Sequence, residues 1–348
     1  MENKHTLVEK VKMYNPDTKE SVSDRKVFGG NPPSDLNLNE IKYKWAISLL
    51  DNFESCTWFT KEVHLGNDRS SYEKLTDYER DMYDKSFSQI TMMDTFQTGN
   101  ISDNIIPYIS APEIKQCLVR QAWEEALHSK SYAVTADTIS PNSDEVFNRY
   151  KTDKVLREKN DIISSIFENV SADRTQENMY LSFYANQALE AIFFQSAFVS
   201  FHTLARGGKM LGTSQMIKFI SRDESNHTIL FKNMIRSTAR ERPYLANDKE
   251  IQHKARKILM DAVELEIAWS DYITSGRVLG LSTNVMSKYI KYLANNIATG
   301  TGLGVLYPDE LNDPMPWVKD FDRNVSKENF FETQVTDYSL GSMNFDDL

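Results

Sequence analysis

The chain has 348 residues and a formal net charge of −10, with 40% hydrophobic and 26% charged residues. This composition is typical of a soluble globular protein and excludes a disordered or fibrous one, and the acidic balance argues against nucleic acid as a partner. Only two cysteines, Cys56 and Cys117, are present, which excludes a disulfide framework and fits the reducing cytoplasm. The charged N-terminal stretch does not have the pattern of a signal peptide.

Helical periodicity dominates the middle of the chain. Residues 1–40 are polar, contain the breaker cluster GGNPPSD, and are expected to form an arm that leads into the fold. Residues 41–300 carry apolar side chains at helical spacing, without the alternation that indicates strands. Residues 301–330 are expected to be irregular, and the acidic residues 331–348 to form a flexible tail. The sequence therefore predicts an all-α protein.

The first candidate site residue is an acid on an apolar helical face. In the segment that ends SFSQITMMDTFQTGN, Asp94 lies above Tyr83, Phe87 and Ile90 at helical spacing. A single inward aspartate is more often a hydrogen-bonded structural residue than a ligand. Its significance depends on what the other helices place beside it.

Histidines three residues after a glutamate give further candidates. The pattern Glu-x-x-His occurs four times, at Glu2 and His5, Glu125 and His128, Glu224 and His227, and Glu250 and His253. Residues three apart share a helix face and can bind one metal ion, but the spacing is also common on solvated faces. The first pair lies in the polar arm, and the fourth lies opposite its helix's apolar stripe. Both are expected at the surface.

The second pair lies beside an apolar stripe. That predicted stripe consists of Val119, Ala122, Ala126 and Ala133. Glu125, His128 and Tyr132 fall together along its edge, so a carboxylate, an imidazole and a phenol line one flank of the helix. A metal site and a salt-bridged helix edge are equally compatible with this segment alone.

An acid also interrupts the most apolar part of the chain. Between Asn178 and Ala205 the only formally charged residue is Glu190, and the stretch is long enough to cross a membrane. Several amides and serines interrupt it and no second span occurs, so we expect a buried helix rather than a membrane segment. Gln187, Phe194, Ala197 and Phe201 are predicted on the same face as Glu190.

The third Glu-x-x-His pair lies on a helix face that is predicted to be buried. Glu224 shares it with Ile217, Ile220 and Phe231, and His227 follows beside it. With this pair, four helices each direct a carboxylate toward the core, and few basic residues are near enough to neutralise them. An uncompensated buried charge is costly, so the arrangement indicates bound cations.

These residues form a recognisable ligand set. The predicted metal ligands are Asp94, Glu125, His128, Glu190, Glu224 and His227. One carboxylate from each of two helices and a Glu-x-x-His from each of two others is the set of ferritin-like dinuclear carboxylate proteins. Oxygen and imidazole donors suit iron or manganese. The sequence therefore predicts a ferritin-like helical bundle with a dinuclear metal site in its core.

From about residue 41 to its end, the sequence resembles the small, radical-generating subunit of class I ribonucleotide reductase. The segments EEALHSKSY, LEAIFFQSAF, RDESNH and NDPMPWV look like signature segments of that family, and the six ligands match in order and spacing. The resemblance implies a homodimer that works with a large subunit in reducing ribonucleotides to 2'-deoxyribonucleotides. It implies two iron ions first, with Mn/Mn or Mn/Fe as alternatives.

The resemblance also gives Tyr132 a role. This residue matches the tyrosine that the family oxidises to a stable radical, after the metal ions have reacted with an oxygen-derived oxidant. Phe194, Phe198 and Ile220 match the apolar wall that shields the radical. Without the metal site, Tyr132 would read as an ordinary half-buried phenol. Family members that store the oxidising equivalent on the metals carry phenylalanine at this position.

Further residues match the family's radical route and docking tail. Trp58 and Asp223, together with His128, would form the hydrogen-bonded route away from the metals. Tyr338 matches the tyrosine that relays the radical to the large subunit, and Glu332 matches a supporting acid. Phe345 and Leu348 in the terminal NFDDL would anchor the tail.

One position departs from part of the family, and two other classes of protein remain open. Gln121 stands where some members have a tryptophan that contacts a ligand carboxylate. A fatty-acyl desaturase or ligand-binding oxidase would explain the six ligands, and so would a ferritin-like metal store. Neither would explain Trp58, Tyr132 and the Tyr338 tail together.

Overall fold

The computed structural model describes residues 3–33 and 35–323. Within these ranges every regular element is helical, and extended chain pairs only in two isolated bridges, Leu7 with Thr175 and Phe28 with Ile109. The prediction of an all-α bundle is therefore confirmed. Residues 324–348, which contain the predicted relay and docking residues Glu332, Tyr338, Phe345 and Leu348, lie outside the described part of the chain.

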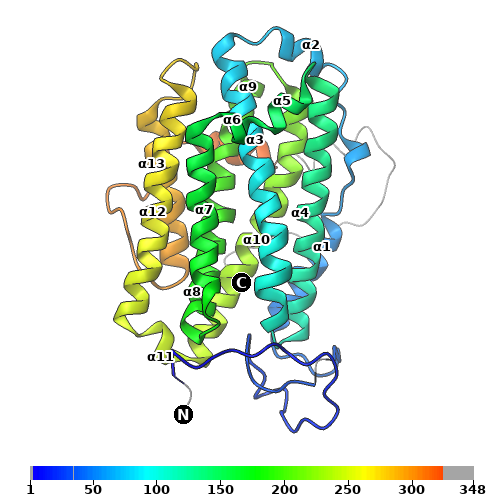
Figure 1. Cartoon of the computed structure of the whole chain (residues 1–348), viewed down its shortest axis with the longest axis vertical. Coiled ribbons are helices and arrows are strands. Elements are labelled where there is room, and N and C mark those ends of the chain that lie inside the picture. Colours follow the sequence, from blue (N-terminus) through cyan, green and yellow to red (C-terminus); the bar gives the residue numbers. More distant parts are fainter. Residues whose placement is uncertain (1–2, 34, 324–348) are drawn as a thin grey trace.

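Long helices that run along the major axis form the centre of the molecule (Figure 1). They are α3 (Asp77–Gly99), α4 (Pro112–Ile139), α8 (Gln176–Ala188), α9 (Gln195–Arg206) and α10 (Leu211–Glu241). Helix α3 packs against α4, and α10 packs against α8 and α9. Between α8 and α9 the chain forms a π-helical segment, η4 (Leu189–Phe194), so the three elements make one continuous rod.

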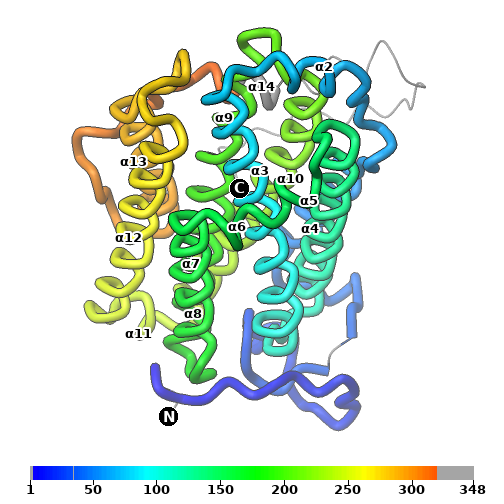
Figure 2. The backbone as a smooth tube through the Cα atoms, turned by 45° about the horizontal axis from the view of Figure 1, so that its top comes forward, coloured from blue at the N-terminus to red at the C-terminus, as the bar shows by residue number. Residues whose placement is uncertain are grey.

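Further helices cover this centre. They are α1 (Lys44–Ser55), α7 (Lys154–Ala172), α12 (Lys249–Thr274) and α13 (Thr283–Gly300). Helix α1 packs on α4 and α10, α7 packs on α8, and α12 packs on both α8 and α13. Figure 2 shows α12 and α13 on the side of the bundle opposite α4.

Short helical elements connect the long ones. They are η1 (Thr60–Glu62), α2 (Asp68–Glu73), η2 (Asn100–Ile105), η3 (Ile106–Tyr108), α5 (Ser143–Phe147), α6 (Arg149–Thr152), α11 (Pro243–Ala246) and α14 (Pro316–Arg323). The element η2 is a second π-helical segment, directly after α3. Helix α14 lies within the segment that the sequence predicts to be irregular, and it begins at Pro316, a residue well suited to a first helical turn.

Polar contacts fix where the central helices begin. Thr76 and Glu79 form a reciprocal capping box at the start of α3. At the start of α10, the Asp68 carboxylate accepts hydrogen bonds from the backbone N–H groups of Gly212 (3.0 Å) and Thr213 (2.6 Å). A carboxylate at a helix N-terminus satisfies free N–H groups and complements the helix dipole. These contacts set the position of α10 along the bundle.

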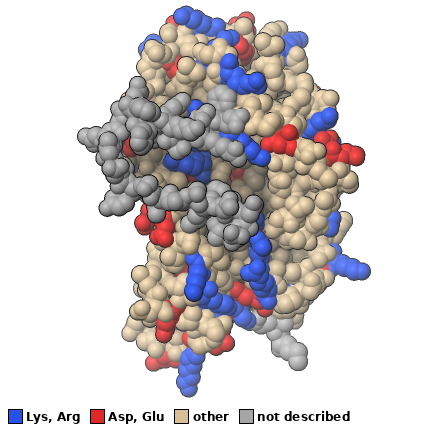
Figure 3. Space-filling view, turned by 180° about the vertical axis from the view of Figure 1, so that it is seen from behind, with Lys and Arg blue, Asp and Glu red and all other residues tan. Residues whose placement is uncertain are grey.

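The stretch long enough to cross a membrane is the core of this bundle. Among the described residues it is the one candidate span, Gln176–Arg206, and 89% of its most apolar window is buried inside the protein. The prediction of a buried helix therefore agrees with the structure. Surface charges are of both signs: on the face in Figure 3, basic and acidic side chains of the described residues are interspersed rather than gathered by sign.

The predicted apolar stripe on α4 is wrong. Val119 is 50% exposed, and Ala126 and Ala133 are also exposed. The buried face of α4 instead carries Glu125, His128 and Tyr132 at 0% exposure, which places them at the centre of that face rather than along its edge. Periodicity assigns a buried face from apolar side chains, and here the buried face is unusually polar.

Candidate metal centre

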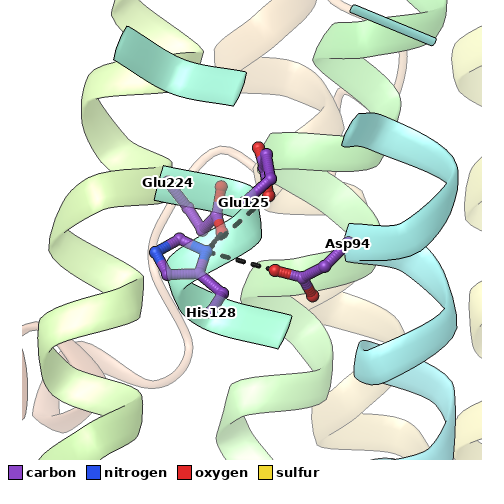
Figure 4. A group of neighbouring side chains, drawn as sticks. All are labelled: Asp94, Glu125, His128 and Glu224. Atoms are coloured by element: carbon purple, nitrogen blue, oxygen red, sulfur yellow. Dashed lines mark hydrogen bonds and ion pairs between the residues drawn. The ribbon is translucent and has the colours of Figure 1, made fainter. Parts of the chain in front are cut away.

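The six predicted ligands converge inside the bundle. Two groups of four residues each bring their ligand atoms within 4.8 Å of one another: Asp94, Glu125, His128 and Glu224 in one, and Glu125, Glu190, Glu224 and His227 in the other. Every member is fully buried. Figure 4 shows the first group, with Asp94 from α3, Glu125 and His128 from α4, and Glu224 from α10 directed toward one another.

The two groups share Glu125 and Glu224, one from each Glu-x-x-His motif. A shared carboxylate can offer one oxygen to each of two cations. Two adjacent cations could therefore be held here, with Glu125 and Glu224 available to both, and with one further carboxylate and one histidine available to each.

Glu190 is presented by a π-helical segment. It is the second residue of η4, where the helix widens between α8 and α9. Short π-helical segments insert an extra residue into a helix and occur frequently at functional sites. The widened turn lies where the chain places its acid among buried aromatic side chains.

Both histidines have the same orientation. The Nδ1 atom of His128 lies 3.1 Å from Asp94 Oδ1 and 3.2 Å from Glu224 Oε1. The Nδ1 atom of His227 lies 2.6 Å from Glu224 Oε2 and 3.3 Å from Glu125 Oε1. Each imidazole thus directs Nδ1 into the acid cluster and Nε2 away from it, which makes Nδ1 the nitrogen available to a metal ion.

Unsatisfied oxygens test whether these residues fit metal ions. One carboxylate oxygen of each of four acids is buried and accepts no well-formed hydrogen bond from the described residues: Asp94 Oδ2, Glu125 Oε2, Glu190 Oε2 and Glu224 Oε1. Glu224 Oε1 lies 3.2 Å from His128 Nδ1 without the geometry of a hydrogen bond. Such groups are costly unless something cationic binds them. Two divalent cations would also balance the charge of the four carboxylates. The donor set, oxygen and imidazole without thiolate, suits iron or manganese.

The acids are held in an environment that opposes their ionisation. Burial, reinforced by the Glu224 carboxylate, raises the pKa of Glu190 to about 8. Burial also raises the pKa of Asp94 well above its usual value and raises that of Glu125. Burial opposes protonation of His128, but its hydrogen bonds to Asp223 and Asp94 raise its pKa well above the usual range. Protons therefore compete with cations for this site.

Trp58 and Asp223 lie on the outer side of His128. The indole Nε1 of Trp58 donates a 2.6 Å hydrogen bond to Asp223 Oδ2, and His128 Nε2 lies 3.2 Å from the same oxygen. The Trp58 ring also stacks with His128, at a centroid distance of 6.2 Å, and with Phe219, at 5.2 Å. One carboxylate oxygen thus joins the indole to the imidazole.

The sequence prediction missed the equivalent partner of His227. Glu124, 1% exposed, lies with Oε2 2.9 Å from His227 Nε2. Its position directly before the predicted ligand Glu125 repeats the position of Asp223 before Glu224. An acid preceding the glutamate of both motifs was the available signal. Such acids orient the histidines of metal sites and raise their basicity.

Two amides hold one oxygen of Glu190. Gln121 donates from Nε2 to Glu190 Oε1 at 2.7 Å, and Gln97 also donates to that oxygen. Gln121, the position where some family members differ, therefore contacts the carboxylate of a predicted ligand in this chain. With Oε1 occupied by two donors, Oε2 is the oxygen of Glu190 that remains for a cation.

Tyr132 is enclosed one helical turn beyond His128. Its side chain is 0% exposed, and its hydroxyl makes no hydrogen bond to the described residues. Burial, followed by the Asp94 charge, raises the pKa of the phenol well above 10. The ring of Phe87 packs edge to face on the ring of Tyr132, with 5.6 Å between the ring centroids. The sequence did not identify this neighbour. The predicted wall residues Phe194, Phe198 and Ile220 are all fully buried.

Among the described residues, Glu250, His253 and His5 do not join this cluster. Glu250 pairs with Lys4 and Lys254 at the surface, and His253 is exposed. His5 is also exposed. Of the four occurrences of the pattern, the two on α4 and α10 are the ones that face each other in the core.

The chain matches one family model over most of its length. Residues 35–314 match the model described as ribonucleotide reductase, small chain. The beta subunit of ribonucleoside-diphosphate reductase from Treponema pallidum is 32% identical over 99% of both chains. The beta subunit from Halalkalibacterium halodurans is 30% identical over 98% of this chain and 99% of its own.

Solved structures of the same kind have the same fold. The ribonucleotide reductase R2 subunit from Clostridium botulinum superposes with a TM-score of 0.86 at 33% identity, covering 91% of this chain and 99% of that one. A dimanganese(II)-NrdF from Streptococcus sanguinis superposes with a TM-score of 0.72 at 23% identity, covering 83% of this chain and 99% of that one. At this identity the likeness supports the fold alone. These matches do not favour a desaturase, a ligand-binding oxidase or a metal store.

Proposed function

The chain belongs to the ribonucleotide reductase small-chain family, and we propose from this premise that its buried acid and histidine cluster is the radical-generating metal centre of a class I enzyme. As a beta subunit it acts with a large subunit in ribonucleoside-diphosphate reduction. The observation that carries the proposal is the pair of ligand groups that share Glu125 and Glu224. When bound, the two metal ions supply the one-electron oxidising power that the side chains lack.

Each ligand then has a defined place. Asp94 and His128 would hold the first metal ion together with the shared glutamates, and Glu190 and His227 would hold the second. Two iron ions, two manganese ions or one of each are compatible with this donor set.

Tyr132 is our proposed site of the stored radical. Its phenol is buried and stays protonated, so its oxidation requires loss of a proton together with the electron. The enclosing aromatic side chains exclude water and reductants from the ring. Phe87 is the contact on which this protection rests most directly.

Trp58, Asp223 and His128 are our proposed route between the metal centre and the protein surface. The shared oxygen of Asp223 accepts from the indole and faces the imidazole, so a proton can move within this group as an electron passes through Trp58. Tyr338, outside the described residues, is proposed as the relay to the large subunit. Phe345 and Leu348 are proposed to anchor the tail there.

The proposed homodimer has a suitable surface on α4. Val119, Trp123, Ala126 and Val134 lie on one exposed side of this helix, and Phe59 packs edge to face on Trp123 at 6.3 Å. Contiguous exposed apolar side chains mark interaction sites.

We expect the wild-type protein to have the molecular mass of two chains in solution, and we expect Trp123→Glu to dissociate this dimer into single chains. Leu279→Glu, at a leucine that is 95% exposed on the opposite side of the bundle, should leave the dimer intact.

The decisive experiment combines metal analysis with electron paramagnetic resonance on protein loaded with Fe(II) or Mn(II) and oxidised. We expect two metal ions per chain and a tyrosyl signal that Tyr132→Phe abolishes. A persistent metal-centred signal in that variant would indicate that the oxidising equivalent is stored on the metal ions rather than on Tyr132. Absence of any radical or oxidised metal signal in the wild-type protein would overturn the proposal.

The tail and the compartment need separate tests. Tyr338→Phe should abolish reductase activity with metal content intact, and unchanged activity would remove Tyr338 from the route.

We place the protein in the cytoplasm, consistent with its two unpaired cysteines, Cys56 and Cys117. Fractionation of cells that express the full chain tests this location.

A further inference from the structure

The acid beside His227 is connected to an arginine. Arg120 Nε lies 3.0 Å from Glu124 Oε1, one helical turn away on α4, and the two side chains are 18% and 1% exposed. Glu124 therefore uses one oxygen for His227 and the other for a guanidinium. A partly buried pair of this kind, with hydrogen bonds at both ends, fixes both side chains in position.

The same arginine reaches the segment that carries Trp58. Arg120 Nη2 donates to Thr57 Oγ1 at 2.9 Å and to the carbonyl oxygen of Phe53 at 3.3 Å. Thr57 directly precedes Trp58, and both follow the end of α1. Arg120 thus joins the histidine of the second metal position to the backbone that holds the indole.

Two hydrogen-bonded paths therefore converge on the dipeptide Thr57–Trp58. One runs from His128 through Asp223 to the indole of Trp58. The other runs from His227 through Glu124 and Arg120 to the hydroxyl of Thr57. Since the histidines belong to different metal positions, the dipeptide is linked to both.

The two paths differ in chemistry. Asp223 is bonded to an indole, which can be oxidised by one electron. Glu124 is bonded to a guanidinium, which is permanently charged and has no accessible oxidation. The path through Glu124 can therefore hold atoms in place but cannot carry the radical.

We propose that Glu124 and Arg120 are positioning residues that orient His227 toward its metal ion and hold Trp58 against Asp223. This inference rests on the proposed function for its role in turnover. Arg120 links the second metal position, through Glu124 and His227, to the position of the Trp58 indole, through Thr57. Removing Glu124 weakens metal binding, whereas cutting the contact between Arg120 and Thr57 disturbs Trp58 without removing metal.

The first test measures binding of Zn(II), a redox-inactive probe of the site, by equilibrium dialysis. In Glu124→Ala, the affinity for one of the two ions should fall about 10- to 100-fold, as expected when the outer partner of a metal-binding histidine is lost. Glu124→Gln keeps an oxygen acceptor for His227 Nε2 and should retain most of the affinity. Glu54→Ala, at an exposed glutamate on α1, is the control. Wild-type affinity for both ions in Glu124→Ala would overturn the assignment of Glu124.

The second test observes Trp58 directly. The chain has five tryptophans, so fluorotryptophan labelling gives five fluorine resonances, of which Trp58→Phe identifies one. Thr57→Val and Arg120→Lys should shift and broaden the Trp58 resonance while both Zn(II) ions remain bound. Ser55→Ala, in the same segment but without a contact to Arg120, should leave it unchanged. An unaltered resonance in both Thr57→Val and Arg120→Lys would overturn the coupling.

These readouts separate the two proposals because neither requires radical chemistry. Wild-type protein that binds two Zn(II) ions and shows the expected variant effects, yet forms no radical with iron or manganese, would refute the proposed function alone. Normal radical formation with unaltered Zn(II) binding in Glu124→Ala would refute the positioning role alone.

Discussion

The indole of Trp58 donates a 2.6 Å hydrogen bond to Asp223, across 165 residues of sequence. The acceptor oxygen also faces His128, so one atom links the segment that follows α1 to the predicted metal ligand His128. A buried hydrogen bond to a charged acceptor is among the stronger kinds. The relationship makes the indole a fixed part of the site rather than a packing residue nearby.

Replacing the indole should separate metal binding from turnover. In Trp58→Phe, metal content should stay at the wild-type level because Trp58 is not a ligand, while reductase activity with the large subunit falls by about 100-fold or more, as expected when a reacting group is lost from its place. Metal analysis and activity assays on one preparation check this. Trp45→Phe, whose indole N–H has no hydrogen-bond partner in the described structure, is the matched control. Full activity in Trp58→Phe would exclude the route.

Loss of the Glu190 carboxylate should reduce metal binding. Glu190→Ala removes a ligand of one position, and we expect metal content to fall from two ions per chain toward one. Elemental analysis after loading and desalting measures it. Glu250→Ala removes the glutamate of an exposed Glu-x-x-His pair and should change nothing. Equal metal content in Glu190→Ala and wild type would show that Glu190 is not a ligand.

Phe87 should control the lifetime of the radical on Tyr132. Phe87→Leu removes the edge-to-face contact at 5.6 Å and gives small molecules more access to the phenol. We expect the tyrosyl signal to form in normal amount and to decay about tenfold faster when a small reductant is added, since shielding of the buried ring is reduced. Time-resolved paramagnetic resonance measures the decay. Phe167→Leu, at a buried phenylalanine on α7, controls for general loosening, and equal decay in the two variants would deny Phe87 a specific role.

The start of α10 should not tolerate a larger residue. A Cβ atom at Gly212 would lie 2.5 Å from the backbone oxygen of His64 and 3.1 Å from the Leu65 Cα. We expect Gly212→Ala to lower the free energy of unfolding by about 1–3 kcal/mol, in the range of other overpacked sites. Gly99→Ala, where nothing lies within 4 Å of the added atom, should be neutral or stabilising by up to about 1 kcal/mol. Urea unfolding of both variants provides the comparison, and equal stabilities would contradict the clash.

A buried ion pair should make stability depend on alkaline pH. Lys159 Nζ lies 2.5 Å from Glu266 Oε2, both side chains are buried, and burial lowers the pKa of Lys159 to about 8. Between this value and the ordinary 10.5, the folded chain binds fewer protons at Lys159 than the unfolded chain does. The contribution of Lys159 to the free energy of unfolding therefore rises as pH rises through that window, by on the order of 1 to 3 kcal/mol.

The double variant Lys159→Met/Glu266→Gln lacks this contribution. Denaturant unfolding at several pH values from 7 to 11 should show the wild type gaining stability relative to the variant as pH rises. The buried tyrosines titrate in both proteins, so their contribution cancels in the difference. A difference that is constant with pH would mean that the Lys159 pKa is not depressed.

The sequence was sufficient for the fold and for the inward direction of three of the four acid-bearing helices. Asp94, Glu190 and Glu224 lie among buried apolar neighbours, so hydrophobic periodicity located their faces. It failed on α4, where the apolar Val119 is exposed and the buried face is polar. A metal centre places polar side chains on a buried face, and the proposed dimer surface would account for the apolar residues that are exposed in the single chain.

Other features have a weak sequence signal or none. An acid directly before the glutamate is common to both core motifs, but its role in Glu124 is shown only by the contact with His227 on another helix. The π-helical segments have helical composition, so periodicity predicts ordinary helix at these positions. Tyr338 and the tail residues lie outside the described chain, so their roles stay predictions from the family resemblance.

The π-helical segment that presents Glu190 has a consequence for the register of the whole rod. Because η4 holds one residue more than a regular helical turn would, every side chain from Gln195 to Arg206 is rotated by about 100° relative to a continuous α-helix begun at Gln176. The faces before and after η4 are thereby set independently of each other. A sequence that lost one residue between Leu189 and Phe194 could remain fully helical and still turn either its acid or its aromatic neighbours away from the metal centre.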